Sequence, residues 1–430
     1  MSLLLTKRLP IQSNWSKIAT PAAPVQKRPR IVLYSHDTMG LGHIRRNLLI
    51  SKTLSGSYLD ADVLLVTSAR ESGLFELSDG VDTLVLPAIS KGLDGNYQPR
   101  RLRMSLEEIS KIRSLTILYA ILAFSPDLII VDNVARGVNG ELTPLLHHVR
   151  NMECTRTVLG LRDVRDDPIA VKKEWAEQRC HDAIRDFYDE VWVYGDAKVY
   201  DARKEYNLPA EIASKFRFTG YLDQTERLHS NSGDGYRKNS KIDMPQKPFG
   251  LCLVGGGQDG GELAEAFASS ILPVGRSGVL ITGPYMEQEV RLRIAKLAAK
   301  NPLLMVKEFV SEPTLYLREA DFVVAMGGYN TVCEALSFDK PTLIVPRVKP
   351  RKEQLIRAEK LQSMGLIEML HPDQLNPKTL SSWMHKLPHR KSISARDHID
   401  LNGLQRLPKM VVELLGLNVT PIRLASQAAS

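Results

Sequence analysis

The chain has 430 residues, of which 43% are hydrophobic and 25% are charged, and its formal net charge is +8 at pH 7. This length exceeds one ordinary hydrophobic core and predicts two domains, and the composition excludes fibrous and disordered proteins. The positive charge suits an anionic small molecule or an anionic membrane surface. Because aromatic residues do not alternate with the basic ones, we do not expect nucleic-acid binding.

The sequence shows no segment typical of export or of a membrane span. Its longest apolar run, residues 117–124, is far shorter than the ~20 residues needed to cross a bilayer, and the N-terminus lacks a signal-peptide pattern. The four cysteines are dispersed without CxxC spacing, which fits a reducing compartment. We therefore expect a cytoplasmic protein, with peripheral contact to the inner face of the membrane as a further expectation.

The first half of the chain alternates between strand and helix patterns. Residues 1–29 are proline-rich and lack periodicity, which predicts a flexible tail. Short apolar runs then predict strands at 31–35, 63–66, 83–86, 127–131, 157–161 and 191–194, and helical spacing predicts helices at 44–54, 106–124 and 168–187. Strands separated by helices indicate parallel pairing, so residues 30–222 are predicted to form a Rossmann-like domain.

A polar segment, residues 223–247, interrupts the pattern and predicts a linker. Afterwards strands are predicted at 249–254, 279–282, 303–306, 321–325 and 341–345, with helices between them, which gives a second Rossmann-like domain at 248–395. A last helix is predicted within 396–417, followed by a flexible tail at 418–430. The fold class is therefore α/β, with two doubly wound domains facing a central cleft, where a ligand would bind.

The densest glycine cluster lies directly after the first strand of the second domain. It includes Gly255, Gly256, Gly257 and Gln258 and continues to Gly261. Backbone N–H groups in such a strand-to-helix turn bind anions. The spacing also satisfies GxGxxG, but no acid ends the next strand and no Gly-Lys-Ser/Thr follows, which disfavours dinucleotide and P-loop sites. A tight turn without a ligand is the alternative.

A second glycine turn, Gly327-Gly328, leads from an apolar strand into another helix. The start of that helix carries four polar side chains that could cap it or bind hydroxyl groups of a ligand: Tyr329, Asn330, Thr331 and Glu334. Glu353 and Gln354 open the next helix at the same sheet edge. Polar groups from adjacent strand ends are therefore expected to converge.

These motifs resemble the C-terminal domain of MurG-like glycosyltransferases, which belong to glycosyltransferase family 28 and have the GT-B architecture. The matching features are the Gly255–Gly261 loop, Phe309-Val310, Gly327-Gly328, Thr331-Val332-Cys333-Glu334-Ala335, Lys340-Pro341, Pro346 and Glu353-Gln354. The resemblance implies that Phe309 and Val310 border the nucleotide base and that Glu334 binds the ribose. It also implies that the glycine loops hold the pyrophosphate and that Glu353 and Gln354 contact the donor sugar.

In the first domain, the segment Gly40-Leu41-Gly42-His43 is similar to the acceptor-side Gly-Gly-His loop of that family. We expect His43 to be the catalytic base because imidazole titrates near neutral pH, and Asp37 is the competing candidate. Arg162 and Asp163 end another strand of the same sheet, where they would bind an anionic acceptor or a leaving phosphate, or form an ordinary loop salt bridge. Arg45 and Arg46 are interpreted as solvated charge on a helix face, and the alternative is that they face an acceptor carrying a lipid phosphate.

The resulting hypothesis is an inverting, metal-independent glycosyltransferase that uses a nucleotide-diphosphate sugar, UDP-linked as in UDP-N-acetylglucosamine, and a hydroxyl acceptor of unknown kind. No cofactor is expected, because metal-ligand spacing is absent from the sequence. Two alternatives remain open. One is an enzyme like UDP-N-acetylglucosamine 2-epimerase, for which Asp37, Asp132 and Asp163 are the candidate acids, and the other is a non-catalytic nucleotide-sugar-binding protein.

Overall fold

The computed structural model describes residues 28–36, 42–69, 72–73, 75–91, 97–152, 154–228, 243–245, 248–310, 312–387 and 393–418. Two residues predicted to belong to the site, Asp37 and Gly40, lie outside these ranges. Within them, no helix is both long enough and apolar enough to cross a membrane.

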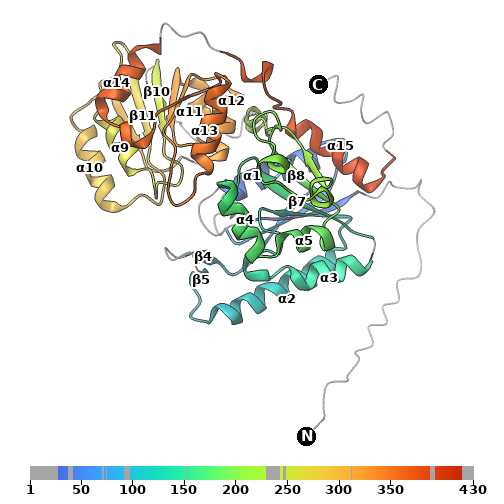
Figure 1. The fold of residues 1–430 in the computed structure, drawn as a ribbon. Coiled ribbons are helices and arrows are strands. Elements are labelled where there is room, and N and C mark those ends of the chain that lie inside the picture. Colours follow the sequence, from blue (N-terminus) through green and yellow to red (C-terminus); the bar gives the residue numbers. More distant parts are fainter. Residues whose placement is uncertain are drawn as a thin grey trace, which may run out of the picture.

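Two parallel sheets form the framework of the protein (Figure 1). In the described residues the first sheet has seven strands in the order β3-β2-β1-β6-β7-β8-β9. Their bounds are β1 (Arg30–Tyr34), β2 (Asp62–Thr67), β3 (Val81–Val85), β6 (Leu128–Asp132), β7 (Arg156–Arg162), β8 (Glu190–Tyr194) and β9 (Phe216–Phe218). A small antiparallel pair, β4 (Ile89–Lys91) and β5 (Tyr97–Pro99), lies apart from this sheet.

The second sheet has six strands in the described residues, in the order β12-β11-β10-β13-β14-β15. Their bounds are β10 (Phe249–Leu253), β11 (Ser277–Ile281), β12 (Leu304–Lys307), β13 (Phe322–Ala325), β14 (Thr342–Ile344) and β15 (Glu368–Met369). All neighbouring strands in both sheets run parallel. The predicted α/β fold with two doubly wound sheets is therefore confirmed.

Helices cover both faces of each sheet. In the first half of the chain they are α1 (Gly42–Gly56), α2 (Leu106–Phe124), α3 (Thr143–Met152), α4 (Pro168–Glu177), α5 (Cys180–Phe187), α6 (Ala202–Glu205) and α7 (Ala210–Ala213). In the second half they are α9 (Gly261–Ala268), α10 (Gln288–Ala298), α11 (Thr314–Glu319), α12 (Tyr329–Ser337), α13 (Glu353–Ser363), α14 (Pro377–His385) and α15 (Gly403–Leu415). Short 3-10 helices occur at η2 (Val138–Gly140), η3 (Gln224–Arg227), η4 (Pro372–Gln374) and η6 (Ala395–Asp397).

Alternating side chains of the central strand β1 show how the layers are held together. Ile31 and Leu33 pack into the core that contains α1 and α15, whereas Val32 and Tyr34 pack into the core beneath α2 and α3. This alternation follows from the two-residue repeat of a strand, and burial of apolar area on both faces explains why the strand reads as a continuous hydrophobic run.

The prediction of one continuous helix after β7 is wrong. Residues 168–187 were expected to form a single helix, but α4 ends at Glu177 and α5 begins at Cys180. Arg179, between them, adopts a left-handed conformation with φ of 48°. A residue in that conformation cannot continue a right-handed helix, so the chain changes direction there.

The chain returns to the first domain after completing the second. Helix α15, drawn in red in Figure 1, packs against α1, and an isolated bridge joins Leu222 to Asn402. Tyr221 N–H donates to the Asp400 carbonyl at 2.8 Å, and Gly403 N–H donates to the Tyr221 carbonyl at 3.0 Å. The two domains are thus linked twice by the backbone.

The strand order reverses at corresponding places in the two sheets, between β1 and β6 and between β10 and β13. In open α/β sheets such reversal points leave room at the carboxyl ends of the strands, where ligands bind. His43 follows β1, and the two glycine turns follow β10 and β13. The candidate site is therefore assembled from both reversal points.

Candidate functional site

His43 is held by a carboxylate from the neighbouring strand. It lies in the first turn of α1, and its Nδ1 is 2.5 Å from Oδ2 of Asp132, the last residue of β6. Arg46, one turn further along α1, donates from Nη2 to the other oxygen of Asp132. The His43 side chain is 16% exposed, whereas those of Asp132 and Arg46 are both 2% exposed, so only the imidazole reaches solvent.

Two groups meet Nδ1 of His43, the Asp132 carboxylate at 2.5 Å and Nη2 of Arg46 at 3.0 Å, and the carboxylate favours a proton on that nitrogen. Burial would raise the pKa of Asp132, but the positive charge of Arg46 and the contact with His43 hold that pKa well below its usual range. The carboxylate is therefore ionised, and it accepts a hydrogen bond from Nδ1–H of His43. The Nε2 atom then keeps its lone pair, which is the state that a general base requires.

A second histidine lies beside this pair. His36 follows β1, and its ring meets the ring of His43 edge to face at 5.7 Å. Burial, together with the charge of His43, lowers the pKa of His36 to about 3. Its Nδ1 atom is buried and has no hydrogen-bond partner among the described residues. The described end of β1 therefore presents a neutral imidazole next to His43.

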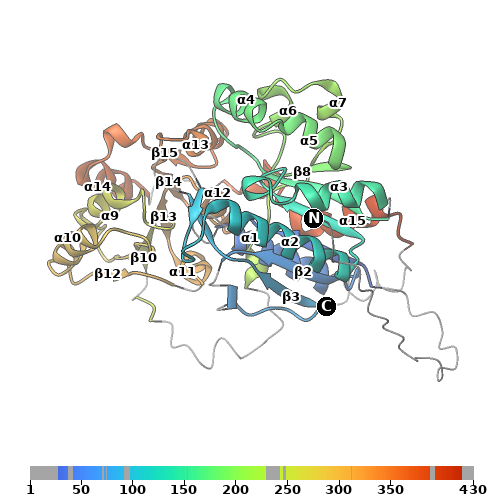
Figure 2. The same ribbon diagram turned by 90° about the horizontal axis from the view of Figure 1, so that it is seen from below.

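The glycine turn of the second domain contacts the first domain at this point. Asn330, in the first turn of α12, donates from Nδ2 to the carbonyl of Gly42 at 2.8 Å. A Cβ atom on Gly42 would lie 3.2 Å from that same nitrogen, which restricts this position to a small residue. The amino termini of α1 and α12 therefore lie side by side, as Figure 2 shows. Asn330 holds the domain contact in this structure.

The glycines of the Gly255 loop differ in what they do. A Cβ atom on Gly257 would lie 2.4 Å from the Thr282 carbonyl, and one on Gly260 would lie 2.4 Å from Val254. These two glycines are therefore required by packing within the protein. Gly255 and Gly256, like Gln258, are exposed, and a Cβ on Gly255 would meet nothing within 4 Å. Backbone open to a ligand is thus confined to the first part of the loop.

The second glycine turn divides its roles in a similar way. Gly327 is buried, and a Cβ atom there would lie 3.0 Å from Gln354. Gly328 is the N-cap residue of α12, it has open space around it, and no side chain caps the helix. The N–H groups in the first turn of α12 therefore lack a capping side chain, and together with the helix dipole they favour an anion. Thr331 lies in the same turn and is partly exposed.

Tyr329, predicted to bind substrate, is buried at 3% exposure. The Arg46 and Arg357 guanidinium groups lie over its ring, with centroid distances of 5.6 and 5.7 Å. The ring also stacks on Tyr221 at 6.3 Å. Its contacts are therefore with protein groups that join the two domains.

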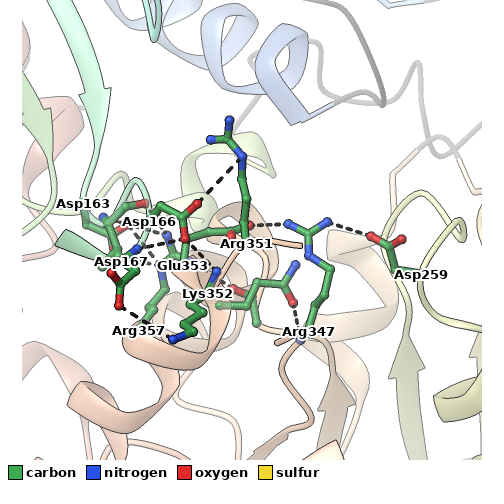
Figure 3. A network of polar contacts seen from close by, with 12 residues as sticks. Asp163, Asp166, Asp167, Asp259, Arg347, Arg351, Lys352, Glu353 and Arg357 are labelled. Atoms are coloured by element: carbon green, nitrogen blue, oxygen red, sulfur yellow. Dashed lines mark hydrogen bonds and ion pairs between the residues drawn. The ribbon is translucent and has the colours of Figure 1, made fainter. Parts of the chain in front are cut away.

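Arg347 links the start of α13 to the Gly255 loop, as Figure 3 shows. It donates to Asp259 at 2.7 Å and to Oε1 of Glu353 at 2.6 Å, and its backbone N–H donates to the Gln354 side chain at 3.0 Å. Oε2 of Glu353 is buried and has no hydrogen-bond partner. This carboxylate therefore retains one oxygen that could accept a hydrogen bond from a hydroxyl group.

Glu334 is buried in α12 and is paired with a cation from the segment that joins the domains. Arg227 of η3 donates to Oε1 of Glu334 at 2.7 Å and to Glu312 at 2.9 Å. Burial raises the pKa of Glu334, and the nearby charges of Arg227 and Arg45 oppose that rise. One oxygen of the carboxylate predicted to bind ribose is therefore already engaged.

Phe309 and Val310 follow β12 and differ in exposure. The Phe309 side chain is 46% exposed, while Val310 packs against the core and its carbonyl accepts a hydrogen bond from Arg45 at 3.4 Å. The interpretation of Arg45 and Arg46 as solvated charge is wrong. Arg46 is buried against Asp132, and Arg45 reaches across to the second domain, because α1 lies at the domain contact.

Asp163 belongs to a buried ion pair between the domains (Figure 3). Arg357 of α13 donates from Nη2 to Oδ1 at 2.6 Å and from Nε to Oδ2 at 2.9 Å. The Tyr221 hydroxyl donates to Oδ2 at 2.9 Å, and Nη1 of Arg357 donates to the Gly327 carbonyl at 2.8 Å. Asp163 therefore serves the domain contact, whereas its neighbour Arg162 makes no such bond.

The sequence analysis did not single out Arg227 or Arg347, and it did not recognise Arg46 and Asp132 as the partners that hold His43. Arg46 and Asp132 orient the imidazole, Arg227 holds Glu334, and Arg347 holds Glu353. The place of Asp132 could have been found, since it ends the strand next to β1 at the reversal point. The arginines carry no comparable local signal.

Comparison with known proteins identifies the second domain. Residues 251–405 match the glycosyltransferase family 28 C-terminal domain. An uncharacterized glycosyltransferase from Methanosarcina mazei is 26% identical over 244 residues, which cover 54% of this chain and 60% of that protein. A similar protein from Methanosarcina acetivorans is 26% identical over 220 residues, covering 50% and 54%. The chain thus spans little more than half the length of these relatives.

A shorter match reaches a protein of named activity. It is the UDP-N-acetylglucosamine--N-acetylmuramyl-(pentapeptide) pyrophosphoryl-undecaprenol N-acetylglucosamine transferase of Geobacillus kaustophilus. The two are 33% identical over 87 residues, which cover 20% of this chain and 24% of that protein. The match is therefore local.

Solved structures share the whole fold at low sequence identity. The calicheamicin glycosyltransferase CalG4 has a TM-score of 0.58 at 15% identity and covers 92% of this chain and 100% of its own. MurG of Acinetobacter baumannii has a TM-score of 0.54 at 14% identity, covering 90% and 99%.

A protein of Listeria monocytogenes, provisionally described as a UDP-N-acetylglucosamine 2-epimerase, has a TM-score of 0.59 at 12% identity, covering 90% and 96%. Both reaction classes therefore occur among proteins of this fold, and the fold alone does not choose between them. The fold is GT-B, and within it residues 251–405 match the glycosyltransferase family 28 C-terminal domain.

Proposed function

We propose that the protein transfers a sugar from a nucleotide-diphosphate sugar to a hydroxyl acceptor, with inversion and without a metal ion. The donor is proposed to be UDP-linked, as in UDP-N-acetylglucosamine. One observation carries this proposal. His43, in the first turn of α1, is paired with Asp132 at the end of β6, and it lies beside the uncapped amino terminus of α12. A base and an anion-binding helix end thus lie at one domain contact.

The reaction follows from these groups. The acceptor hydroxyl attacks the anomeric carbon of the donor sugar, its proton passes to Nε2 of His43, and the bond between that carbon and the diphosphate oxygen breaks. Asp132 stabilises the imidazolium that forms. A base of this kind contributes about 10²- to 10⁴-fold to the rate. A single displacement of this type inverts the anomeric configuration.

The leaving diphosphate needs groups that stabilise its growing negative charge. We assign this role to the N–H groups at the start of α12 and to the exposed Gly255-Gly256 backbone. A preorganised donor is worth about 3 to 4 kcal/mol in a transition state. Several such donors would therefore contribute more than the base.

The remaining donor contacts follow from the resemblance to the family and from the geometry. Exposed Phe309 is assigned to the base and Glu334 to the ribose, where Arg227 would orient the carboxylate. The unpartnered Oε2 atom of Glu353, with Gln354 beside it, is assigned to a hydroxyl of the donor sugar. A carboxylate oxygen suits such a hydroxyl because it accepts without needing a proton of its own.

The epimerase remains the second candidate, and the described carboxylates disfavour it. Such a reaction needs acids and bases that can exchange protons with the sugar ring. Asp132 is held ionised by Arg46 and His43, and both oxygens of Asp163 are bound by Arg357. Neither carboxylate is therefore free to take a proton from carbon. A non-catalytic sugar-nucleotide sensor would not need the oriented imidazole.

The test uses nucleotide sugars without added metal and with a chelator, first without acceptor and then with glycan or lipid extracts. Release of UDP only when an extract is present supports the transferase, whereas appearance of a sugar epimer without acceptor would select the epimerase. His43→Ala should abolish UDP release without changing UDP binding. His148→Ala is the matched control, because His148 is an exposed histidine on α3.

Peripheral contact with an anionic membrane is a separate proposal. Exposed apolar side chains repeat along α2, namely Ile112, Leu115 and Tyr119, which are 38%, 43% and 67% exposed. The exposed basic segment 100–103 precedes this helix. An apolar face beside positive charge favours anionic lipid. Co-sedimentation with phosphatidylglycerol vesicles, but not with phosphatidylcholine vesicles, would support the contact.

A further inference from the structure

In the part of the chain that the structure describes, Arg162 forms no ion pair with an acid, unlike four other arginines near the domain contact. Arginines in this region form ion pairs with carboxylates: Arg46 with Asp132, Arg165 with Glu174, Arg347 with Glu353 and Arg357 with Asp163. Among the described residues no hydrogen bond or ion pair to the Arg162 guanidinium is formed, and its Nε atom is buried without a partner. The side chain as a whole remains partly exposed.

The position of Arg162 lies between the two halves of the proposed active site. It ends β7, the strand that pairs with β6, and Asp132 lies opposite Gly160 in that pairing. The charges that act on Arg162 come from Arg46 and Asp132 in the first domain and from Arg357 and Glu353 in the second. The guanidinium group therefore lies near the proposed base and near the carboxylate assigned to the donor sugar.

Acids near Arg162 do not neutralise all of the positive charge that surrounds it. Burial and the charges of Arg46 and Arg357 lower the pKa of Arg162 to about 10, so the group is still charged at neutral pH. The acids that act on Arg162, Asp132 and Glu353, are paired with Arg46 and Arg347, and the adjacent Asp163 is paired with Arg357. A buried charge without a partner is costly, and an anion of the right size would remove that cost.

His36, like Arg162, has a buried nitrogen atom without a hydrogen-bond partner among the described residues. His36 is neutral, because its pKa is about 3, and its Nδ1 atom is buried without a hydrogen bond. His36 follows β1 and Arg162 ends β7, so the two residues lie at the carboxyl edge of the sheet on either side of β6. A neutral imidazole can donate one N–H, so two hydrogen-bond donors are available to a single anionic group.

We propose that Arg162, with His36 beside it, binds a carboxylate or phosphate group of the acceptor, close to the hydroxyl that His43 deprotonates. This inference rests on the proposed function, and it names the acceptor class as anionic. We assign Arg162 to the acceptor and not to the donor diphosphate, because Arg162 belongs to the first domain, which also carries the proposed base. The unoccupied N–H groups that suit a diphosphate belong to the second domain.

The test compares ligands that share hydroxyl groups and differ in charge: methyl glucoside, methyl glucuronide and glucose 1-phosphate. Their affinities for the full-length protein are measured by calorimetry, with and without saturating UDP. Hydrogen bonds to charged groups are strong enough to favour an anionic ligand by about tenfold or more. We expect that preference in the wild type, its loss in Arg162→Gln and its partial retention in Arg162→Lys.

The two anionic ligands distinguish a carboxylate acceptor from a phosphate acceptor. Arg276→Gln is the control, because it removes a cation from a surface ion pair with Asp321, far from β7 in the sequence. Equal affinity for neutral and charged ligands in the wild type, or no binding of either anion, would overturn the proposal.

UDP affinity separates this proposal from the proposed function. Arg162→Gln should bind UDP as the wild type does, and a loss of UDP affinity would instead assign the guanidinium to the leaving diphosphate. Failure of the wild type to bind UDP would contradict the donor site. The preference for anions can still be measured in that case.

Discussion

The buried ion pair between Asp163 and Arg357 should control how firmly the two domains are held together. Both side chains are at most 1% exposed, and the guanidinium group also donates to the Gly327 carbonyl in the glycine turn. Asp163→Asn keeps the shape of the side chain but removes its charge. The positive charge of Arg357 then remains buried without an acid.

The expected cost follows from this loss of compensation. Removing one partner of a buried pair typically costs about 3 to 5 kcal/mol, because the other charge stays desolvated. In the wild type burial lowers the pKa of Arg357 and Asp163 raises it. The variant loses the contribution of Asp163, but an arginine guanidinium has so high an intrinsic pKa that it keeps its proton and cannot escape the cost. The double variant Asp163→Asn/Arg357→Met should recover much of the loss, since no buried charge is left.

Two measurements check this prediction. Urea unfolding gives the change in stability for the single and double variants, and small-angle X-ray scattering reports whether the domains separate. We expect a larger radius of gyration in Asp163→Asn than in the wild type or the double variant. Asp182→Asn, which removes an acid from an exposed pair with Arg179, serves as the control and should change little.

The reasoning would be refuted by either of two results. One is an Asp163→Asn variant whose unfolding midpoint and scattering match those of the wild type. The other is a double variant whose loss of unfolding free energy equals the sum of the losses in Asp163→Asn and Arg357→Met. Additive costs would mean that the two charges do not interact across the domain contact.

Three further predictions concern the site. Asp132→Asn should lower kcat by about 10²- to 10⁴-fold with UDP affinity unchanged, and a change in UDP affinity alone would contradict the role assigned to this carboxylate. Folding lowers the pKa of His36 from 6.5 to about 3. As pH falls below 6.5, the unfolded chain therefore takes up a proton that the folded protein does not, and the folded state loses stability. Between pH 7 and pH 5 this loss should reach about 2 kcal/mol in urea unfolding, and it should be absent from His36→Gln. Gly257→Ala should lower the melting temperature more than Gly255→Ala, since both have positive φ but a Cβ on Gly257 would clash with the Thr282 carbonyl. Equal shifts would show that the clash is relieved.

The fold was largely predictable because its signals are local. Each central strand is a short apolar run, and each sheet edge near the site carries glycines after such a run. Several of the elements that were missed have weak signals of this kind: β9 has three residues, β15 has two, and the helix break at Arg179 depends on one backbone conformation. Short edge strands bury too few side chains to leave a pattern.

The sequence determined the family of the second domain, the two glycine turns and His43 as a candidate base. It could not determine which charged groups are partners, because those partners lie far apart in the chain. His43 and Asp132 are 89 positions apart, and Asp163 and Arg357 are 194 positions apart. The parallel order of the strands brings His43 to Asp132, and the packing of the two domains brings Arg357 to Asp163.

Tertiary structure also decided which polar residues remain available to a ligand. Asp163 and Arg162 are adjacent at the end of one strand and read as equivalent candidates in the sequence. In the folded protein Asp163 is neutralised by Arg357 from the other domain, whereas Arg162 forms no ion pair with an acid in the part of the chain that the structure describes. Adjacent side chains on a strand point to opposite faces, so neighbours in sequence meet different surroundings, and only the packing of the two domains distinguishes them.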